Sequence, residues 1–140
     1  MVMGVIETAL QCNGHADVGR VAVLLPILFD EKMVDLLLDS NMQYTFRQLV
    51  QQNNMYLANY NDRYLSMLNP FYHALSIMMD ADFVKLNGAI IEPSSKKCFG
   101  IVASGKSSRM QRVSDAAERL LKLAERESNK ELYQLLKVTL

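Results

Sequence analysis

The chain has 140 residues, enough for a single domain spanning residues 1–140 with a core of its own. Half of the residues are apolar, which excludes a disordered chain. The longest apolar run, Val21–Phe29, is too short for a transmembrane helix, and Met1–Leu10 holds Glu7 and no base, unlike a secretory signal. The net charge is zero and only two cysteines occur, which favours a reducing, cytoplasmic location without membrane attachment.

The first part of the chain predicts two helices. Val2–Cys12 forms the first, and Asn13-Gly14 ends it because glycine adopts the left-handed conformation that closes a helix. Asp17 is a suitable N-cap for a second helix that runs into Val21–Phe29. Pro26 lies inside this stretch and has no backbone N–H, so we expect a kink or a break there.

The middle of the chain predicts four further helices. Asp30 can cap a short one, and Thr45-Phe46-Arg47-Gln48 has the spacing of a capping box for the next. A longer helix spans about Asn54–Leu68. Asn69-Pro70 then supplies an N-cap and a first-turn proline for Pro70–Met79, which is apolar almost all round and should be central. Tyrosines repeat every four residues along the longer helix, at Tyr56, Tyr60 and Tyr64.

The clearest local signal is a β-hairpin. Two short stretches, Phe83–Leu86 and Ala89–Glu92, flank Asn87-Gly88, the pair that best supplies the two positive φ angles of a type I′ turn. Residues 94–107 are rich in Ser, Lys and Gly and indicate a loop. A helix that leads directly into a two-stranded hairpin is typical of a winged helix.

Two helices close the chain. Ser108-Arg109-Met110-Gln111 has capping-box spacing, and the apolar residues after it predict an amphipathic helix to about Glu127. Ser128 can cap a last short helix. The predicted fold is mainly α: a helical domain with one β-hairpin in a winged-helix-like arrangement.

One segment matches the phosphate-binding loop pattern. Gly100–Ser107 has the glycine, lysine and serine of that motif in the required positions. A functional loop needs a buried strand before it and a second strand that ends in a magnesium-binding aspartate. The stretch before it is mostly polar, and the remaining residues predict no such strand. A chance match is therefore favoured, and a nucleotide-binding enzyme is kept as a third hypothesis.

The same region is basic. Five bases follow one another without an acid between them and could contact nucleic-acid phosphate or an acidic protein surface. The alternative is a solvated loop and helix start. If Pro70–Met79 were a recognition helix, it would offer no Lys, Arg, Asn or Gln to read base edges, so sequence-specific DNA binding is disfavoured. The five bases are Lys96, Lys97, Lys106, Arg109 and Arg112.

Charge is distributed unevenly along the chain. Residues 1–40 are mainly acidic, residues 94–140 are mainly basic, and residues 41–79 carry only Arg47, Asp62 and Arg63. A long stretch with so few charges is either buried or covered by a partner. The tyrosine repeat suits a half-buried face or a protein interface equally well. We therefore predict partner binding through Tyr56, Tyr60, Tyr64, Arg109 and Arg112.

No catalytic, metal or cofactor site is predicted. Cys12 and His15 have Cys-x-x-His spacing, but His73 and Cys98 have no partner at a ligand spacing, so a zinc site is disfavoured, and a Cys/His catalytic pair has no supporting glycine-rich or acidic setting. Asp80 and Asp82 flank a tight connection, where acids are common turn residues. The residues thus favour a protein that binds other proteins rather than an enzyme.

Several stretches together resemble a known family, the middle components of three-component ABC-ATPase conflict systems, which include the accessory subunit of Lamassu-type antiphage defence. The resemblance covers nearly the whole chain and is carried by Val23–Phe29, Tyr44–Val50, Asn54–Met79, Phe83–Glu92 and Leu132–Val138. Members of this family often have glycine where Lys137 stands here.

The resemblance implies a non-enzymatic adaptor. Such a subunit would bridge an SMC/Rad50-like ABC ATPase and an effector, often a nuclease, with DNA as a further contact within the complex. It implies no catalytic residue and no cofactor. It also implies that Pro26, Phe29, Leu135, Leu136 and Val138 are framework positions. The alternative from the residues themselves is a winged-helix protein that binds nucleic acid through residues 96–112.

Overall fold

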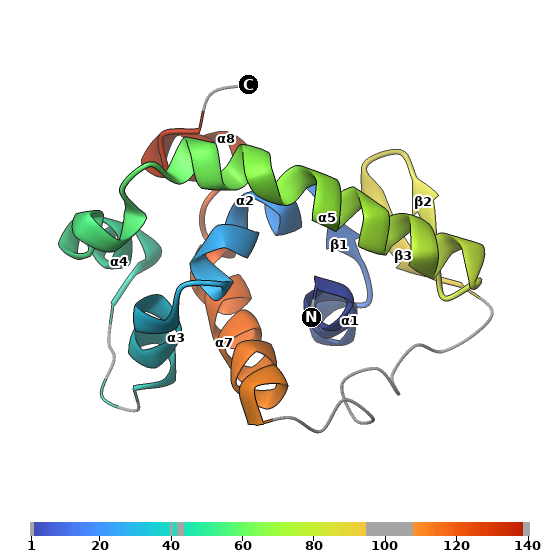
Figure 1. Ribbon diagram of the computed structural model, residues 1–140, viewed down its shortest axis with the longest axis horizontal. Coiled ribbons are helices and arrows are strands. Elements are labelled where there is room, and N and C mark those ends of the chain that lie inside the picture. Colours follow the sequence, from blue (N-terminus) through green and yellow to red (C-terminus); the bar gives the residue numbers. More distant parts are fainter. Residues whose placement is uncertain (1, 40, 42–43, 95–107, 139–140) are drawn as a thin grey trace.

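The structure, a computed structural model, describes residues 2–39, 41, 44–94 and 108–138 and is mainly helical (Figure 1). α5 runs along one side of the domain from α8 to the hairpin, and α2 lies between α5 and α7. α1 and α3 both pack against α7. The elements are α1 (Val2–Asn13), β1 (Ala16–Asp17), α2 (Val18–Leu28), α3 (Glu31–Leu38), α4 (Phe46–Gln52), the 3₁₀ helix η1 (Asn54–Leu57), α5 (Tyr60–Asp80), β2 (Val84–Asn87), β3 (Ile90–Pro93), α7 (Ser108–Ala124) and α8 (Asn129–Leu135).

The predicted helix starts are confirmed by their caps. The Asp17 carboxylate accepts a hydrogen bond from the Arg20 amide at the start of α2, and Asp30 accepts from two amides of α3. Thr45 and Gln48 form the complete capping box of α4, and Ser128 caps α8. Side-chain acceptors of this kind satisfy amides that have no partner within the helix. These short-range pairings could be predicted because both partners lie within one turn.

Pro26 and Pro70 both lie inside helices, so neither marks the helix break or helix start that the sequence predicts. α2 continues through Pro26 and ends two residues later, at Leu28. The prediction that Pro70 opens a new helix is wrong, because α5 is one helix from Tyr60 to Asp80 with Pro70 inside it. The buried positions of α5 follow one continuous three-four spacing on both sides of Pro70, so packing keeps the helix intact. Pro70 itself is exposed, where water can satisfy the carbonyl that loses its amide partner.

The predicted hairpin is present, but its turn is shifted by one residue. Asn87 pairs with Ile90, so the two turn residues are Gly88 and Ala89. Gly88 has φ 63°, and neither Asn87 nor Ala89 has a positive φ. Glycine at the first central position is typical of a type II′ turn rather than the predicted type I′.

A third strand joins the hairpin. β1, which the sequence did not predict, pairs antiparallel with β3 and gives the strand order β1-β3-β2. The fold class is therefore confirmed as mainly helical, with a small antiparallel sheet. The winged-helix arrangement itself stays a prediction. None of the helices in the described part of the chain is long and apolar enough to cross a membrane.

α7 ends earlier than predicted, and Lys137, just after α8, has a left-handed conformation. α7 stops at Ala124, not near Glu127, and the predicted capping box at Ser108 involves a side chain outside the described residues. After α8, Lys137 has φ 57°, and the Val138 amide donates to the Tyr133 carbonyl at 2.9 Å. This is the Schellman arrangement, in which glycine normally occupies the left-handed position. The residue at this position has a left-handed conformation, which explains why members of the resembled family often have glycine here.

Replacing Lys137 with glycine should stabilise the protein. The left-handed conformation costs a non-glycine residue free energy, so Lys137→Gly should raise the free energy of unfolding by about 1 kcal/mol. Lys130→Gly is the matched control, because Lys130 lies inside α8 and glycine there should lower stability by about the same amount. Urea denaturation measures both. A destabilising Lys137→Gly would contradict the strain assigned to this position.

The core lies where α1, α2, α5 and α7 meet. Its fully buried side chains come from several helices and include Ile6, Leu25, Phe46, Phe71 and Leu120. The framework positions implied by the resemblance fit this core: Pro26, Leu136 and Val138 are buried, and Phe29 and Leu135 pack against it.

Candidate partner-binding surfaces

Part of the predicted basic segment lies outside the described residues. This applies to Lys96, Lys97 and Lys106, to the phosphate-loop match at 100–107, and to Cys98. Arg109 and Arg112 are described, both in the first turns of α7. Of the basic segment, the structure thus places only these two arginines.

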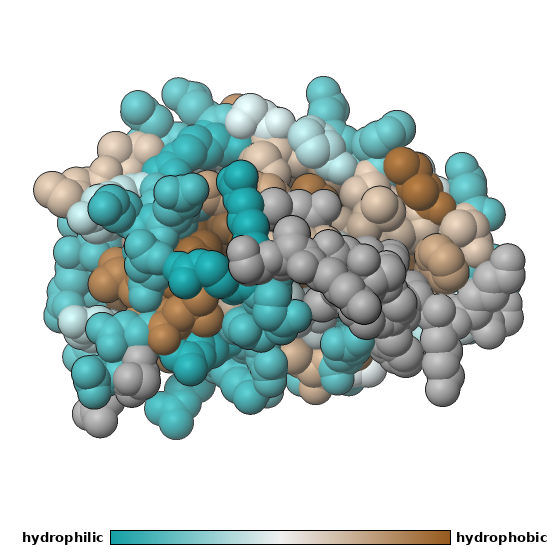
Figure 2. Space-filling model, turned by 60° about the horizontal axis from the view of Figure 1, so that its bottom comes forward, coloured by the Kyte–Doolittle hydropathy of each residue, from teal (hydrophilic) through white to brown (hydrophobic). Residues whose placement is uncertain are grey.

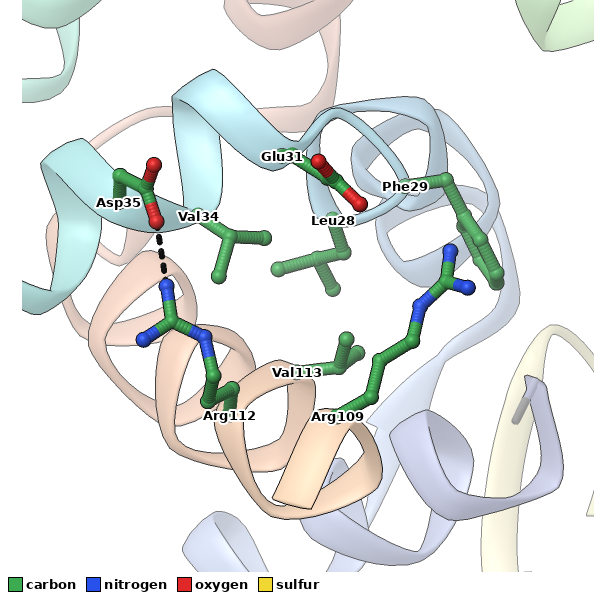
Figure 3. A pocket seen from close by; sticks show the side chains of 8 residues that line it. All are labelled: Leu28, Phe29, Glu31, Val34, Asp35, Arg109, Arg112 and Val113. Atoms are coloured by element: carbon green, nitrogen blue, oxygen red, sulfur yellow. Dashed lines mark hydrogen bonds and ion pairs between the residues drawn. The ribbon is translucent and has the colours of Figure 1, made fainter. Parts of the chain in front are cut away.

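Arg109 and Arg112 line a groove between α3 and α7. In Figure 2, apolar side chains show between hydrophilic ones on the half of the molecule that carries these helices. Figure 3 shows the groove itself: apolar side chains form its floor, and two acids of α3 face two arginines of α7. Its volume is about 320 Å³. The lining residues are Leu28, Phe29, Glu31, Val34, Asp35, Arg109, Arg112 and Val113.

The two arginines differ in how they are held. Arg112 forms an ion pair with Asp35, and both side chains are at least half exposed, so the pair contributes little stability. Arg109 reaches from α7 toward the side of the groove formed by the end of α2 and the start of α3 (Figure 3). It has no ion-pair or hydrogen-bond partner among the described residues and is exposed. Arg109 is the arginine of this groove that remains available to a bound anion.

The predicted tyrosine stripe is not formed. Tyr56 belongs to η1, whereas Tyr60 and Tyr64 belong to α5. Tyr60 is 3% exposed and Tyr64 4%, so both are core residues that a partner cannot reach in this conformation. The Tyr60 hydroxyl donates to the Val23 carbonyl of α2, and the Tyr64 ring packs edge-on against Tyr133 with 5.9 Å between centroids. Partner binding through Tyr56, which is partly exposed, stays a prediction.

The outer face of α5 carries apolar side chains that the sequence left unassigned. Leu65, Tyr72 and Met79 are 49%, 50% and 40% exposed and are spaced seven residues apart, so they lie along one side of the helix. Leu68 lies partly buried on the same side. No charged residue occurs between Arg63 and Asp80. We call Leu65, Leu68, Tyr72 and Met79 the α5 stripe. An exposed apolar row without charges on a surface helix is typical of a protein-binding face.

No metal site appears among the described residues. None of the described His, Cys, Asp and Glu side chains form a group that could hold a metal ion. Burial, with a smaller contribution from the Glu118 carboxylate, raises the pKa of the Cys12 thiol above its ordinary value. A raised pKa keeps the thiol protonated and unreactive at neutral pH.

The sequence is similar to one family of known proteins. A family model described as ABC-three component (ABC-3C) system Middle Component 3 (MC3) matches residues 13–140. No curated protein and no solved structure matches the chain. The matched segment includes β1, every helix from α2 onward and both strands of the hairpin. The chain therefore belongs to the Middle Component 3 family of ABC-three component systems.

Proposed function

We propose that this protein is a non-enzymatic adaptor subunit that bridges an SMC/Rad50-like ABC ATPase and an effector, such as a nuclease, in a bacterial antiphage complex of the Lamassu type. Membership in a family of middle components supports a role as an accessory subunit of a larger assembly. The observation that carries the adaptor function is the α5 stripe, an apolar row on a helix face without charges.

The chemistry of the α5 stripe suits a helical partner. Side chains seven residues apart stay on one side of a helix, and a second helix with a similar spacing can insert its side chains between them. Because the stripe has no charges between Arg63 and Asp80, the partner surface must be apolar and uncharged too. Interfaces between permanent subunits are more apolar than transient ones. We therefore assign the α5 stripe to the constitutive partner, the ABC ATPase.

A charge placed in the α5 stripe should weaken assembly. Tyr72→Asp puts a carboxylate in the middle of the stripe, and we expect binding to the ATPase component to weaken by about tenfold or more, the effect of one central contact residue. The components encoded beside this chain are co-expressed, and their recovery with the tagged subunit is measured. Leu65→Asp and Met79→Asp test the two ends of the stripe.

Two controls separate binding from folding. Gln51→Asp adds the same charge on α4, where Gln51 is exposed, and should leave recovery unchanged. Circular dichroism checks that each variant keeps its helical content. If all three stripe variants assemble like the unchanged protein, the α5 stripe is not the interface. If the unchanged protein stays alone beside its components, the adaptor function itself is wrong.

A further inference from the structure

A second and larger pocket lies on a part of the surface that shares no residue with the α5 stripe. It lies between Asp39 after α3, the residues 44–47 at the start of α4, and the end of α7 with the turn after it, and its volume is about 660 Å³. The lining residues are Asp39, Tyr44, Thr45, Phe46, Arg47, Arg119, Lys122, Leu123, Arg126 and Glu127. Bases outnumber acids in this lining, although the whole chain carries no net charge.

Three of the bases come from the end of α7 and the turn that follows it. Arg119 and Lys122 are three residues apart, so they lie on the same side of α7, and Arg126 follows in the turn after the helix. Arg119 is held in place because its Nη1 atom donates to the Leu37 carbonyl oxygen at 2.9 Å, at the end of α3. That contact fixes the guanidinium without neutralising its charge, which lowers the entropy lost when an anion binds.

The remaining charges are only partly balanced. Arg47 lies 3.4 Å from a Glu127 oxygen and 3.8 Å from a Glu131 oxygen, so these acids and this arginine compensate each other. Lys122 pairs with Glu118 at 3.3 Å across a well-exposed contact, which is weak in water. Arg126 is exposed and makes no ion pair or hydrogen bond with the described residues. Arg119 and Arg126 are thus the cations that a ligand would meet.

We propose that this basic pocket binds an acidic segment of a protein partner. Arginine guanidinium groups form paired, charge-assisted hydrogen bonds with the carboxylates of Asp and Glu. Tyr44 and Leu123, both half-buried, add apolar contact for side chains beside those carboxylates. The inference rests on the proposed adaptor function, since it supplies the second contact that a bridging subunit needs.

A protein ligand fits this pocket better than a nucleic acid does. The lining mixes acids with bases, so its positive charge is confined to separate points and does not form the continuous basic surface that a row of phosphates requires. The site is a partly open pocket at one place on the surface, whereas duplex DNA needs an extended basic surface that follows its backbone. A single acidic side chain, or a short segment of them, needs only the local cations Arg119 and Arg126.

The test uses overlapping short peptides that cover the other components of the same system, immobilised and probed with the full-length protein. Peptides rich in Asp and Glu should be retained, and retention should fall as salt is raised. Arg126→Glu should weaken that retention by about tenfold or more, the effect of losing one charged hydrogen bond and adding a repulsion. Because Arg126 has no partner among the described residues, the substitution should leave the fold unchanged.

Matched variants make each outcome informative. Lys130→Glu changes the net charge equally on exposed α8, outside the basic pocket, and should leave retention unchanged. Tyr72→Asp in the α5 stripe should also leave retention unchanged, so failure of the adaptor interface and failure of this pocket can be told apart. Equal losses with Lys130→Glu, or no preference for acidic over neutral peptides, would overturn the proposal. Binding of a labelled DNA duplex that depends on Arg126, without peptide binding, would assign the pocket to nucleic acid instead.

Discussion

Replacing Arg20 with alanine should lower the free energy of unfolding by about 3 kcal/mol, because two charge-assisted hydrogen bonds are lost together. The Nη1 atom of Arg20 donates to the Ala124 carbonyl oxygen at 2.6 Å, and Nη2 donates to the Glu127 carbonyl oxygen at 2.5 Å. These carbonyls belong to the end of α7 and the turn after it, where no further helical turn supplies amide donors. A cation near a helix C-terminus is also favoured by the helix dipole. The first turn of α2 is thus fastened to the end of α7.

The geometry of this contact can be tested apart from its charge. Arg20→Lys keeps a positive charge but replaces the planar fork with a single ammonium group, so it should recover only part of the lost stability. Arg109→Ala is the control, since Arg109 is exposed and has no partner among the described residues. It should change stability by no more than about 0.5 kcal/mol. Urea denaturation gives the free energies. Similar losses for Arg20→Ala and Arg109→Ala would show that the two carbonyl contacts contribute nothing.

The sequence predicted those features whose signals lie within one turn of the chain. The Asp17, Asp30 and Thr45 caps, and the hairpin around Gly88, each depend on residues at most a few positions apart. Such pairings form from the local backbone alone, and the residue types that make them are few. The turn was still wrong by one position, because pairing with β1 as well as β2 fixes the register of β3.

Features that depend on distant residues could not be predicted. Asn69-Pro70 has the local pattern of a helix start, yet Tyr64 and Phe71 on either side of it face the same core. The burial of Glu7 within α1, which Gln11 contacts at 3.4 Å, has no signal in a helix that otherwise appears ordinary. β1 consists of two residues, too few for an alternating pattern to be recognised.

The candidate surfaces also combine features that nearby residues predict with features that depend on residues far apart in the sequence. Arg109 and Arg112 could be named from a run of bases, but their groove exists only because α3 packs beside α7. The basic pocket joins Arg47 to Arg119, which are separated by a long stretch of sequence. The lack of charge in residues 41–79 correctly indicated buried surface, because one side of α5 belongs to the core. That a partner covers the α5 stripe on its other side stays a prediction.

Replacing Tyr60 with phenylalanine should lower the free energy of unfolding by about 1–2 kcal/mol, the cost of losing a hydrogen bond to a buried polar group. The Tyr60 hydroxyl donates to the Val23 carbonyl oxygen of α2, which lies within one turn of Pro26. Proline already removes one amide from this turn. The Tyr60 hydroxyl therefore links α5 to the turn of α2 that lacks one backbone hydrogen bond because of Pro26.

The same tyrosine should make stability depend on alkaline pH. Burial raises the pKa of the Tyr60 hydroxyl far above its ordinary value, outweighing the Ile27 amide, which lowers it. A group whose pKa is higher in the folded state stabilises the fold at neutral pH, and that contribution is lost as pH rises above the pKa of the unfolded tyrosine, about 10. In Tyr60→Phe this loss should be smaller but not absent, because burial also raises the pKa of Tyr133. Urea denaturation of the variant and of the unchanged protein across alkaline pH measures the difference.

Tyr72→Phe is the control for the Tyr60 hydroxyl. Tyr72 is half exposed on the same helix, and its ring contact with Phe71, 5.4 Å between centroids, survives the loss of the hydroxyl. Its free energy of unfolding should stay within about 0.5 kcal/mol of the unchanged protein. Pro26→Ala tests the coupling: with an amide restored at position 26, the Tyr60 hydroxyl should matter less, so the double variant should lose less than Tyr60→Phe loses alone. Strictly additive effects would mean that the hydroxyl does not compensate for the proline, even if Tyr60→Phe is destabilising.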